Sequence, residues 1–252
     1  MKKAVNVFIC AFVMIMCVSA ALPAAQKVLL VTGEWIPYTG KNIPHYGFFT
    51  EIVTAVFKEM GVDAEYRFYP WKRCELMVKS GEAYAAFPYR ITSEREKEFN
   101  FSSPVAFSTG RFFYYDEFVT GDVVYASYKD LKPYKIGGVL GYWYEKDFND
   151  AGLNVEYVAS DDQNIKKLKI GRVQLAAMDE IVGWQLVQKY YPDEMHKFKV
   201  LSRPLNESDL RLMVSKKYTD ADKLNDAFNA ALKGIKAKGV YRAILKKYNM
   251  KE

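Results

Sequence analysis

The sequence predicts an α/β protein built from two lobes, and three observations support this prediction. Strand-like and helix-like segments alternate, which is typical of sheets with largely parallel strands. The alternation occurs in two successive series, which predicts one sheet in each lobe. Two extended segments, 111–115 and 210–214, follow the first and the second series and predict two crossings between the lobes. Two crossings would form a hinge.

The first series predicts one lobe. Its expected elements are a strand at 28–32, a helix at 48–60, a strand at 65–69, a helix at 71–79 and a strand at 83–87. The helix at 48–60 has the strongest pattern, because its apolar residues keep the spacing of a single helix face and Gly61 follows as a stop signal.

The second series predicts the other lobe. Its expected elements are a strand at 135–139, a helix at 143–149, a strand at 155–158, a helix at 162–170, a strand at 175–178 and a helix at 181–190. Helices expected at 224–235 and 240–248 return to the first lobe. The prediction therefore assigns residues 26–112 and 211–252 to lobe 1 and residues 113–210 to lobe 2.

The N-terminus has the pattern of a secretory signal peptide. Lys2 and Lys3 precede an apolar run at 4–18, and mostly small residues follow up to Ala25. The apolar run of about 15 residues is too short for a bilayer, which needs about 20. We expect cleavage after Ala25, with Ala20 as the alternative, so that residues 1–25 are removed and the mature protein lies in the periplasm.

Composition argues against nucleic-acid binding, a disulfide and a metal site. Loss of Lys2 and Lys3 lowers the net charge from +6 to +4, and the lysines are scattered among acids, so no nucleic-acid partner is expected. Cys74 is the one thiol outside the signal peptide, which predicts a buried, inert side chain and no internal disulfide. The two histidines, His45 and His196, give no basis for a metal site, and no cofactor is expected.

A ligand crevice is expected beyond the carboxyl ends of the strands. That edge collects three tryptophans and several arginines, a combination that stacks on flat groups and binds anions. The candidate ligand-binding residues are Arg95, Trp35, Trp71, Arg90, Arg73, Tyr142, Trp143, Asp179 and Glu180. Catalytic residues are not expected, because no Ser-His-Asp set is recognisable.

Several candidates have a structural alternative. Trp35 and Trp71 could belong to the core of the first lobe. Arg73 could pair with a neighbouring acid. Asp179 and Glu180 could be acids that stabilise the N-terminus of a helix through its dipole.

Residues 92–104 resemble the bacterial extracellular solute-binding proteins of family 3, the polar amino-acid binders that serve ABC transporters. The shared pattern is Thr-x-x-Arg, an apolar residue, a polar residue and Phe-Ser-x-Pro. Segments 47–52, 78–81 and 239–244 are similar to the same family, so the resemblance covers essentially the whole mature chain. It implies the type II periplasmic-binding-protein fold, with mostly parallel sheets flanked by helices and two hinge crossings.

The resemblance also implies roles for individual residues. The family's arginine, which binds the ligand carboxylate bidentately, falls on Arg95. The aromatic residue that packs on the ligand falls on Trp35, and the acid that binds an ammonium group falls on Asp179 or Glu180. The implied partners are a small carboxylate-bearing ligand and the permease of an ABC transporter, or a membrane receptor, with the protein acting as a monomer.

Two positions depart from the family pattern. Tyr142 and Trp143 follow Gly141 where the family usually has small hydroxyl residues, and backbone amides at this helix start are expected to remain as anion donors. Arg90 occupies a position where the family commonly has a small polar residue, which adds a second cation. The ligand therefore stays open among an α-amino acid, a dicarboxylate, a modified or aromatic amino acid and another organic acid.

The expected function is ligand capture by lobe closure, without enzyme activity. The alternative is a dehydratase similar to cyclohexadienyl dehydratase on the same scaffold. Such an enzyme needs a protonated carboxylic acid in an apolar pocket, and Glu180 is the candidate for that group.

Overall fold

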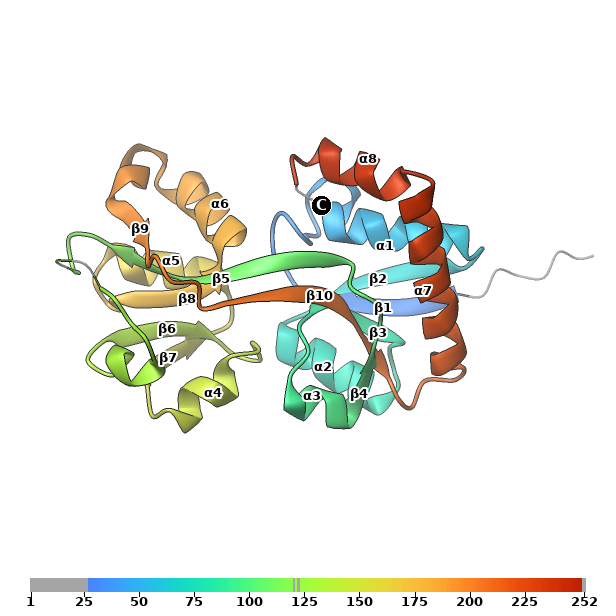
Figure 1. The fold of residues 1–252 in the computed structure, drawn as a ribbon, viewed down its shortest axis with the longest axis horizontal. Coiled ribbons are helices and arrows are strands. Elements are labelled where there is room, and N and C mark those ends of the chain that lie inside the picture. Colours follow the sequence, from blue (N-terminus) through green and yellow to red (C-terminus); the bar gives the residue numbers. More distant parts are fainter. Residues whose placement is uncertain (1–26, 120, 122, 251–252) are drawn as a thin grey trace, which may run out of the picture.

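The computed structural model describes residues 27–119, 121 and 123–250 and has two α/β lobes joined by two long strands (Figure 1). The predicted signal peptide, residues 1–25, lies outside the described residues. Across the described ranges, no helix combines the length and the apolar character that a membrane span requires.

Lobe 1 has a parallel three-stranded core. Strand β1 (Lys27–Thr32) pairs in parallel with β2 (Asp63–Phe68) and with β3 (Ala85–Tyr89). The helices of this lobe are α1 (Phe48–Glu59), α2 (Trp71–Ser80), α3 (Ser93–Glu98), α7 (Ala221–Ala237) and α8 (Val240–Lys247), and β4 (Phe99–Phe101) is a short additional strand. Helices α7 and α8 pack against α1, so the predicted return of the C-terminal helices to lobe 1 is confirmed (Figure 1).

Lobe 2 repeats the same arrangement. Strand β6 (Lys135–Val139) pairs in parallel with β7 (Asn154–Val158) and with β8 (Leu175–Asp179). Its helices are α4 (Glu145–Asp150), α5 (Asp161–Lys169) and α6 (Glu180–Tyr190), and β9 (Phe198–Val200) is a short additional strand. Short 3₁₀ turns lie at Pro44–Tyr46, Tyr128–Leu131 and Pro192–Lys197.

Two strands cross between the lobes. Strands β5 (Ala106–Tyr115) and β10 (Asn206–Ser215) pair antiparallel, with Asn206 opposite Gly110 and Leu210 opposite Ala106. Towards lobe 1 β10 pairs with β3 and β4, and towards lobe 2 β5 pairs with β8 and β9. Both predicted crossings are confirmed, and both strands are longer than predicted because small and polar residues extend them. The predicted lobe boundaries fall inside these strands, so the dividing residues stay a prediction.

The apolar packing is divided mostly by lobe, although Val139 and Val182 of lobe 2 join the lobe 1 cluster, and the two strands are the natural place for a hinge. In lobe 1 the buried rings include Phe49, which stacks on Phe87 at 5.7 Å. In lobe 2, consecutive residues of β5 point to opposite faces of the sheet. Phe112 stacks on Phe148 on one face, and Phe113 packs in a separate cluster on the other.

Several predicted boundaries were wrong for identifiable reasons. Helix α4 begins at Glu145 and not at Trp143, because Gly141 adopts φ +80° and the chain turns before the helix starts. Strand β3 begins two residues later than predicted, at Ala85. Helix α3 was not predicted, because its sequence Ser-Glu-Arg-Glu-Lys-Glu contains no apolar residue and therefore no hydrophobic period.

Candidate functional site

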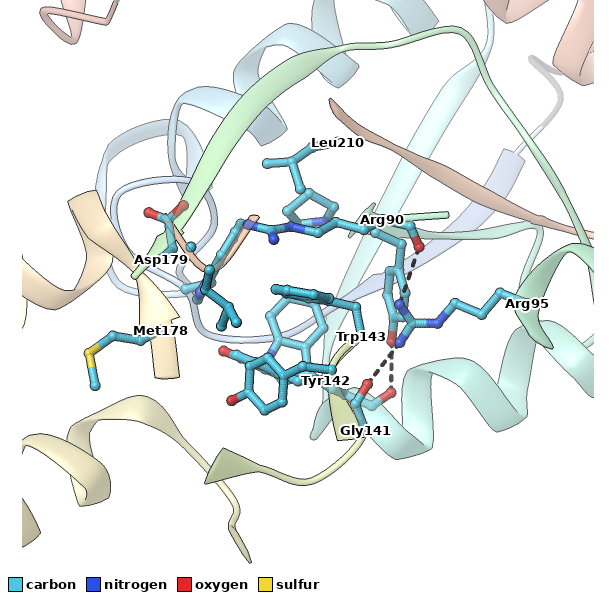
Figure 2. Close-up of a pocket in the computed structure, with 15 residues that line it drawn as sticks. Arg90, Arg95, Gly141, Tyr142, Trp143, Met178, Asp179 and Leu210 are labelled. Carbon is cyan, nitrogen blue, oxygen red and sulfur yellow. Dashed lines mark hydrogen bonds between the residues drawn. The ribbon is translucent and has the colours of Figure 1, made fainter. Parts of the chain in front are cut away.

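A cavity lies between the two lobes, at the carboxyl ends of the parallel strands. Its lining residues come from both lobes and from both crossing strands (Figure 2): Trp35, Trp71, Pro88, Tyr89, Arg90, Arg95, Gly110, Gly141, Tyr142, Trp143, Tyr144, Met178, Asp179, Leu205 and Leu210. The cavity has about 50 Å³ of free volume, well below the roughly 300–1,000 Å³ of typical small-molecule sites. The lobes therefore lie closed against each other.

The lobe 1 wall of the cavity is a packed group of aromatic rings. Trp35 follows β1 and stacks on Tyr38 with 4.3 Å between ring centroids. Trp71, the first residue of α2, meets Trp35 edge to face at 6.3 Å. Gly33 makes this packing possible, because a Cβ there would lie 2.6 Å from the Trp71 ring. Trp35 and Trp71 are each 8% exposed, so they serve both as core residues and as cavity wall.

The lobe 2 wall is the turn between β6 and α4. Tyr142 meets Trp71 of lobe 1 edge to face at 6.3 Å, so aromatic rings from both lobes touch across the cavity. The Tyr142 hydroxyl donates to Oδ2 of Asp161 at 2.5 Å. Burial raises the pKa of the Asp161 carboxyl to about 7, while the Tyr142 hydroxyl acts to lower it. Trp143 and Tyr144 complete this wall.

Arg95 connects the two lobes. Thr92 caps α3 with its side-chain oxygen, which accepts from the Arg95 backbone N–H at 3.2 Å and sets the start of this helix. The Arg95 guanidinium donates to the backbone carbonyls of Arg90 at 3.2 Å and of Gly141, in lobe 2, at 2.8 Å. It also pairs with the Glu75 carboxylate at 3.5 Å.

Arg90 follows β3 and is 4% exposed. Its guanidinium donates to Ser108 Oγ on β5 at 2.6 Å and to Asn206 Oδ1 on β10, and it lies over the Trp143 ring at 4.6 Å. Burial lowers the pKa of this guanidinium, and the charge of Asp179 acts in the opposite direction. Within the described part of the chain, Arg90 forms no ion pair.

Asp179 is the acidic residue of the cavity. It ends β8, and its Oδ1 accepts from the backbone amides of Ile181 and Val182 at 3.0 and 3.2 Å, so it also caps α6. Its Oδ2 accepts from the Tyr38 hydroxyl of lobe 1 at 3.4 Å. Burial raises the pKa of the Asp179 carboxyl to about 6, although the α6 amides and Arg90 limit the rise.

Two predicted site residues lie outside the cavity. Glu180 begins α6 and pairs with Arg111 of β5 at 3.0 Å, so its carboxylate is already engaged away from the cavity. Arg73 is exposed and its guanidinium lies over the Tyr69 ring at 4.3 Å. The spacing of buried residues along α2 explains the latter placement, because Trp71 and Cys74 define the inward face and Arg73 falls between them.

The expected backbone anion site at Gly141 is also corrected. The Gly141 N–H donates to Glu145 Oε2 at 2.6 Å, and the Tyr142 N–H donates to the Val139 carbonyl at 3.3 Å. Both amides are therefore engaged within lobe 2. Positive charge in the cavity comes from side chains instead.

The Cys74 thiol lies in the core and takes no part in the cavity. It donates to the Thr32 carbonyl at 3.4 Å, and burial raises its pKa to about 12. A thiol with such a pKa stays protonated near neutral pH, which agrees with the predicted inert side chain. Among residues 27–119, 121 and 123–250, no three His, Cys, Asp or Glu side chains are grouped as metal ligands.

Several residues around the cavity were missed by sequence reasoning. Ser108, Gly110, Asn206, Leu205 and Leu210 belong to the crossing strands or border them, and the prediction considered only the ends of parallel strands. Asp161 was missed as well, because an acid at the start of a helix is usually exposed and gives no sign of burial.

Comparison with known proteins identifies a family and a fold. The model of the bacterial extracellular solute-binding proteins, family 3, matches residues 28–251. No curated protein sequence matches the chain.

Three solved structures illustrate the structural similarity. An ancestral arginine-binding protein bound to arginine is 24% identical, with a TM-score of 0.74 and coverage of 88% of this chain and 97% of that one. An amino acid ABC transporter substrate-binding protein from Streptococcus pneumoniae, bound to L-arginine, is 20% identical, with a TM-score of 0.72 and coverage of 88% and 93%. A histidine kinase sensor domain is 17% identical, with a TM-score of 0.77 and coverage of 88% and 96%. These similarities show a shared fold.

Proposed function

Because the chain belongs to the bacterial extracellular solute-binding proteins of family 3, we propose that it captures a small carboxylate-bearing ligand by closing its two lobes. The ligand class is an amino acid or a related organic acid. The mature protein acts as a periplasmic monomer after removal of residues 1–25 and delivers the ligand to the permease of an ABC transporter.

The observation that carries this proposal is the distribution of charge across the cavity. Arg90 and Arg95 approach it from lobe 1, and Asp179 approaches it from lobe 2. A zwitterion has a carboxylate for the guanidinium side and an ammonium group for the carboxylate side. The surrounding rings exclude water, which strengthens both contacts.

Entry of the ligand requires the lobes to separate. The free volume of about 50 Å³ is too small for an amino acid, and the aromatic walls of the two lobes touch at Trp71 and Tyr142. Rotation about β5 and β10 would open this contact and would also release Val139 and Val182 of lobe 2 from the lobe 1 cluster. The ligand then takes part of the space that the closed walls occupy.

A thermal shift screen tests the proposal. The mature protein is heated with each of the twenty common L-amino acids and with small organic acids. A ligand at about 100 times its Kd stabilises the folded state by about 2.7 kcal/mol, which corresponds to a Tm rise of about 5–10 °C at this chain length. Calorimetry would then give the affinity. Failure of every compound to raise Tm would contradict the proposal.

A sensing role is the second candidate, supported by the similarity to a histidine kinase sensor domain. Both roles require the same ligand-induced closure. Uptake of the radiolabelled ligand separates them: a strain lacking this protein loses uptake if the protein serves a transporter, and keeps uptake if it serves only a receptor.

An enzyme on the same scaffold is the third candidate. Asp179, with a pKa raised by burial to about 6, replaces Glu180 as the carboxylic acid that such chemistry would need. We propose binding without chemistry. Incubation with prephenate, followed by a product scan, should therefore return the compound unchanged.

A further inference from the structure

We propose that Arg90 is the guanidinium that binds the ligand carboxylate, and that Arg95 is a positioning residue that holds the lobes closed. The inference deepens the proposed function and rests on it. It reverses the assignment that the family pattern suggests, in which the arginine of the Thr-x-x-Arg motif is the carboxylate ligand.

Arg95 already has an anionic partner and two backbone acceptors. The Glu75 carboxylate lies 3.5 Å from its guanidinium, and the carbonyls of Arg90 and Gly141 accept two of its N–H groups. The bond to Gly141 joins α3 of lobe 1 to the β6–α4 turn of lobe 2. Lobe separation must break this bond, so Arg95 stabilises the closed form directly.

Arg90 is buried beside the cavity with neutral partners. Ser108 and Asn206 each accept one hydrogen bond from it, and the face of Trp143 covers its guanidinium. Arg90 is only 4% exposed, and no carboxylate of the described chain forms an ion pair with it. A buried charge with no carboxylate at ion-pair distance is costly, and a ligand carboxylate would lower that cost.

The positions of the two arginines fit this division. Figure 2 shows Arg95 reaching Gly141, whereas the Arg90 side chain extends toward the side of the cavity where Asp179 lies. A ligand between Arg90 and Asp179 would present opposite charges to the two side chains. The Gly141 and Tyr142 amides do not compete for the carboxylate, because both are engaged within lobe 2.

Calorimetry with matched acid and amide probes tests the role of Arg90. The probes are L-glutamine, L-histidine and L-phenylalanine, each with its α-carboxamide, which lacks the negative charge. The wild-type protein should prefer an acid over its carboxamide by about 30-fold or more, because a buried charge pair contributes about 2 kcal/mol or more. Arg90→Met should abolish this preference. Arg95→Met should weaken the binding of the acid and of the carboxamide by a similar factor, so that the preference for the acid remains.

A preference that survives in Arg90→Met, or disappears in Arg95→Met, overturns the proposal. If Arg90→Met binds neither probe, Arg90→Lys is tested instead. This variant keeps the positive charge and should therefore keep the preference for the acid. Loss of the preference in Arg90→Lys overturns the proposal. Arg73→Met is the matched control, since that guanidinium lies outside the cavity. If no acid binds the wild-type protein, amino-acid binding itself fails.

Small-angle scattering of the ligand-free variants tests the role of Arg95 independently of the ligand. Arg95→Met should increase the radius of gyration, because the bond to Gly141 is lost. Arg90→Met should increase it less, and Arg73→Met should leave it unchanged. Equal radii for the wild-type and Arg95→Met proteins, or a larger increase in Arg90→Met, overturn the assignment of Arg95.

Discussion

The two lobes face the cavity with opposite charges and with walls that are buried to different degrees. Lobe 1 supplies arginines and a wall of tryptophans that also belongs to its core. Lobe 2 supplies Asp179, the nearby Asp161 and a turn in which Tyr142 and Trp143 are partly buried while Tyr144 belongs to the core. Under the proposed function, neither lobe alone would pair both charges of a zwitterionic ligand. Closure completes the site.

Removal of the lobe 2 charge should have the largest effect on binding. Asp179→Asn keeps a side chain that can cap α6 but removes the negative charge. Amino-acid affinity should fall by about 30-fold or more, since loss of one member of a buried charge pair costs about 2 kcal/mol or more. Calorimetry measures this. Unchanged affinity together with unchanged Tm would remove Asp179 from the site.

The same substitution on the two walls should separate the loss of core packing from the loss of ligand contact. Trp71→Ala removes a ring that is 8% exposed, so it should lower Tm as well as affinity. Trp143→Ala removes a half-buried ring that covers Arg90, so it should weaken binding by about tenfold with little change in Tm. Thermal melts and calorimetry on both variants make the comparison. An equal loss of Tm in both would show that the walls do not differ.

The pH dependence of stability should reveal the titration of Asp161, one of the two buried carboxylates of lobe 2. Burial raises the pKa of Asp161 to about 7, so the folded protein holds this proton more tightly than the unfolded chain does. Its contribution to the free energy of unfolding therefore falls as pH rises from about 4 to about 8.

Asp161→Asn removes that contribution while an amide oxygen can still accept from Tyr142. The Tm of the variant minus the Tm of the wild type should be several degrees higher at pH 8 than at pH 5. Each kcal/mol of stability corresponds to about 2–4 °C at this chain length. A difference that is constant with pH would mean that Asp161 titrates normally.

The smallest effect is expected outside the cavity. Arg73→Met loses a guanidinium that lies over Tyr69 on the exposed face of α2. Affinity should stay within about twofold, and Tm should change little, because exposed substitutions usually alter stability by less than about 0.5 kcal/mol. A tenfold loss of affinity would place Arg73 in the ligand site after all.

The sequence was most informative where a hydrophobic period existed. Helix α1 has one apolar face and was predicted to within a residue at both ends. Helix α3 has no apolar residue and was not predicted. The strand ends indicated Trp35, Trp71, Arg90 and Asp179, and these residues line the cavity because parallel strands bring their carboxyl ends to one edge. Their role in ligand binding stays a prediction.

The rest of the site depends on contacts between the lobes. The engagement of Gly141 by both Glu145 and Arg95 requires the turn before α4 and the closed arrangement, neither of which a local pattern contains. The polar contacts of Arg90 come from β5 and β10, which are 18 and 116 residues away in sequence. By contrast, Arg73 was predicted as a ligand residue although the spacing of Trp71 and Cys74 already places it on the exposed face of α2.

A crystal structure of the protein with the amino acid that raises Tm most would test the central claim directly. The account predicts a closed complex in which a ligand carboxylate oxygen lies within about 2.7–3.2 Å of the Arg90 guanidinium, with the ammonium group toward Asp179. A ligand bound elsewhere, or a carboxylate held by Arg95 while Arg90 keeps only its neutral partners, would contradict the account.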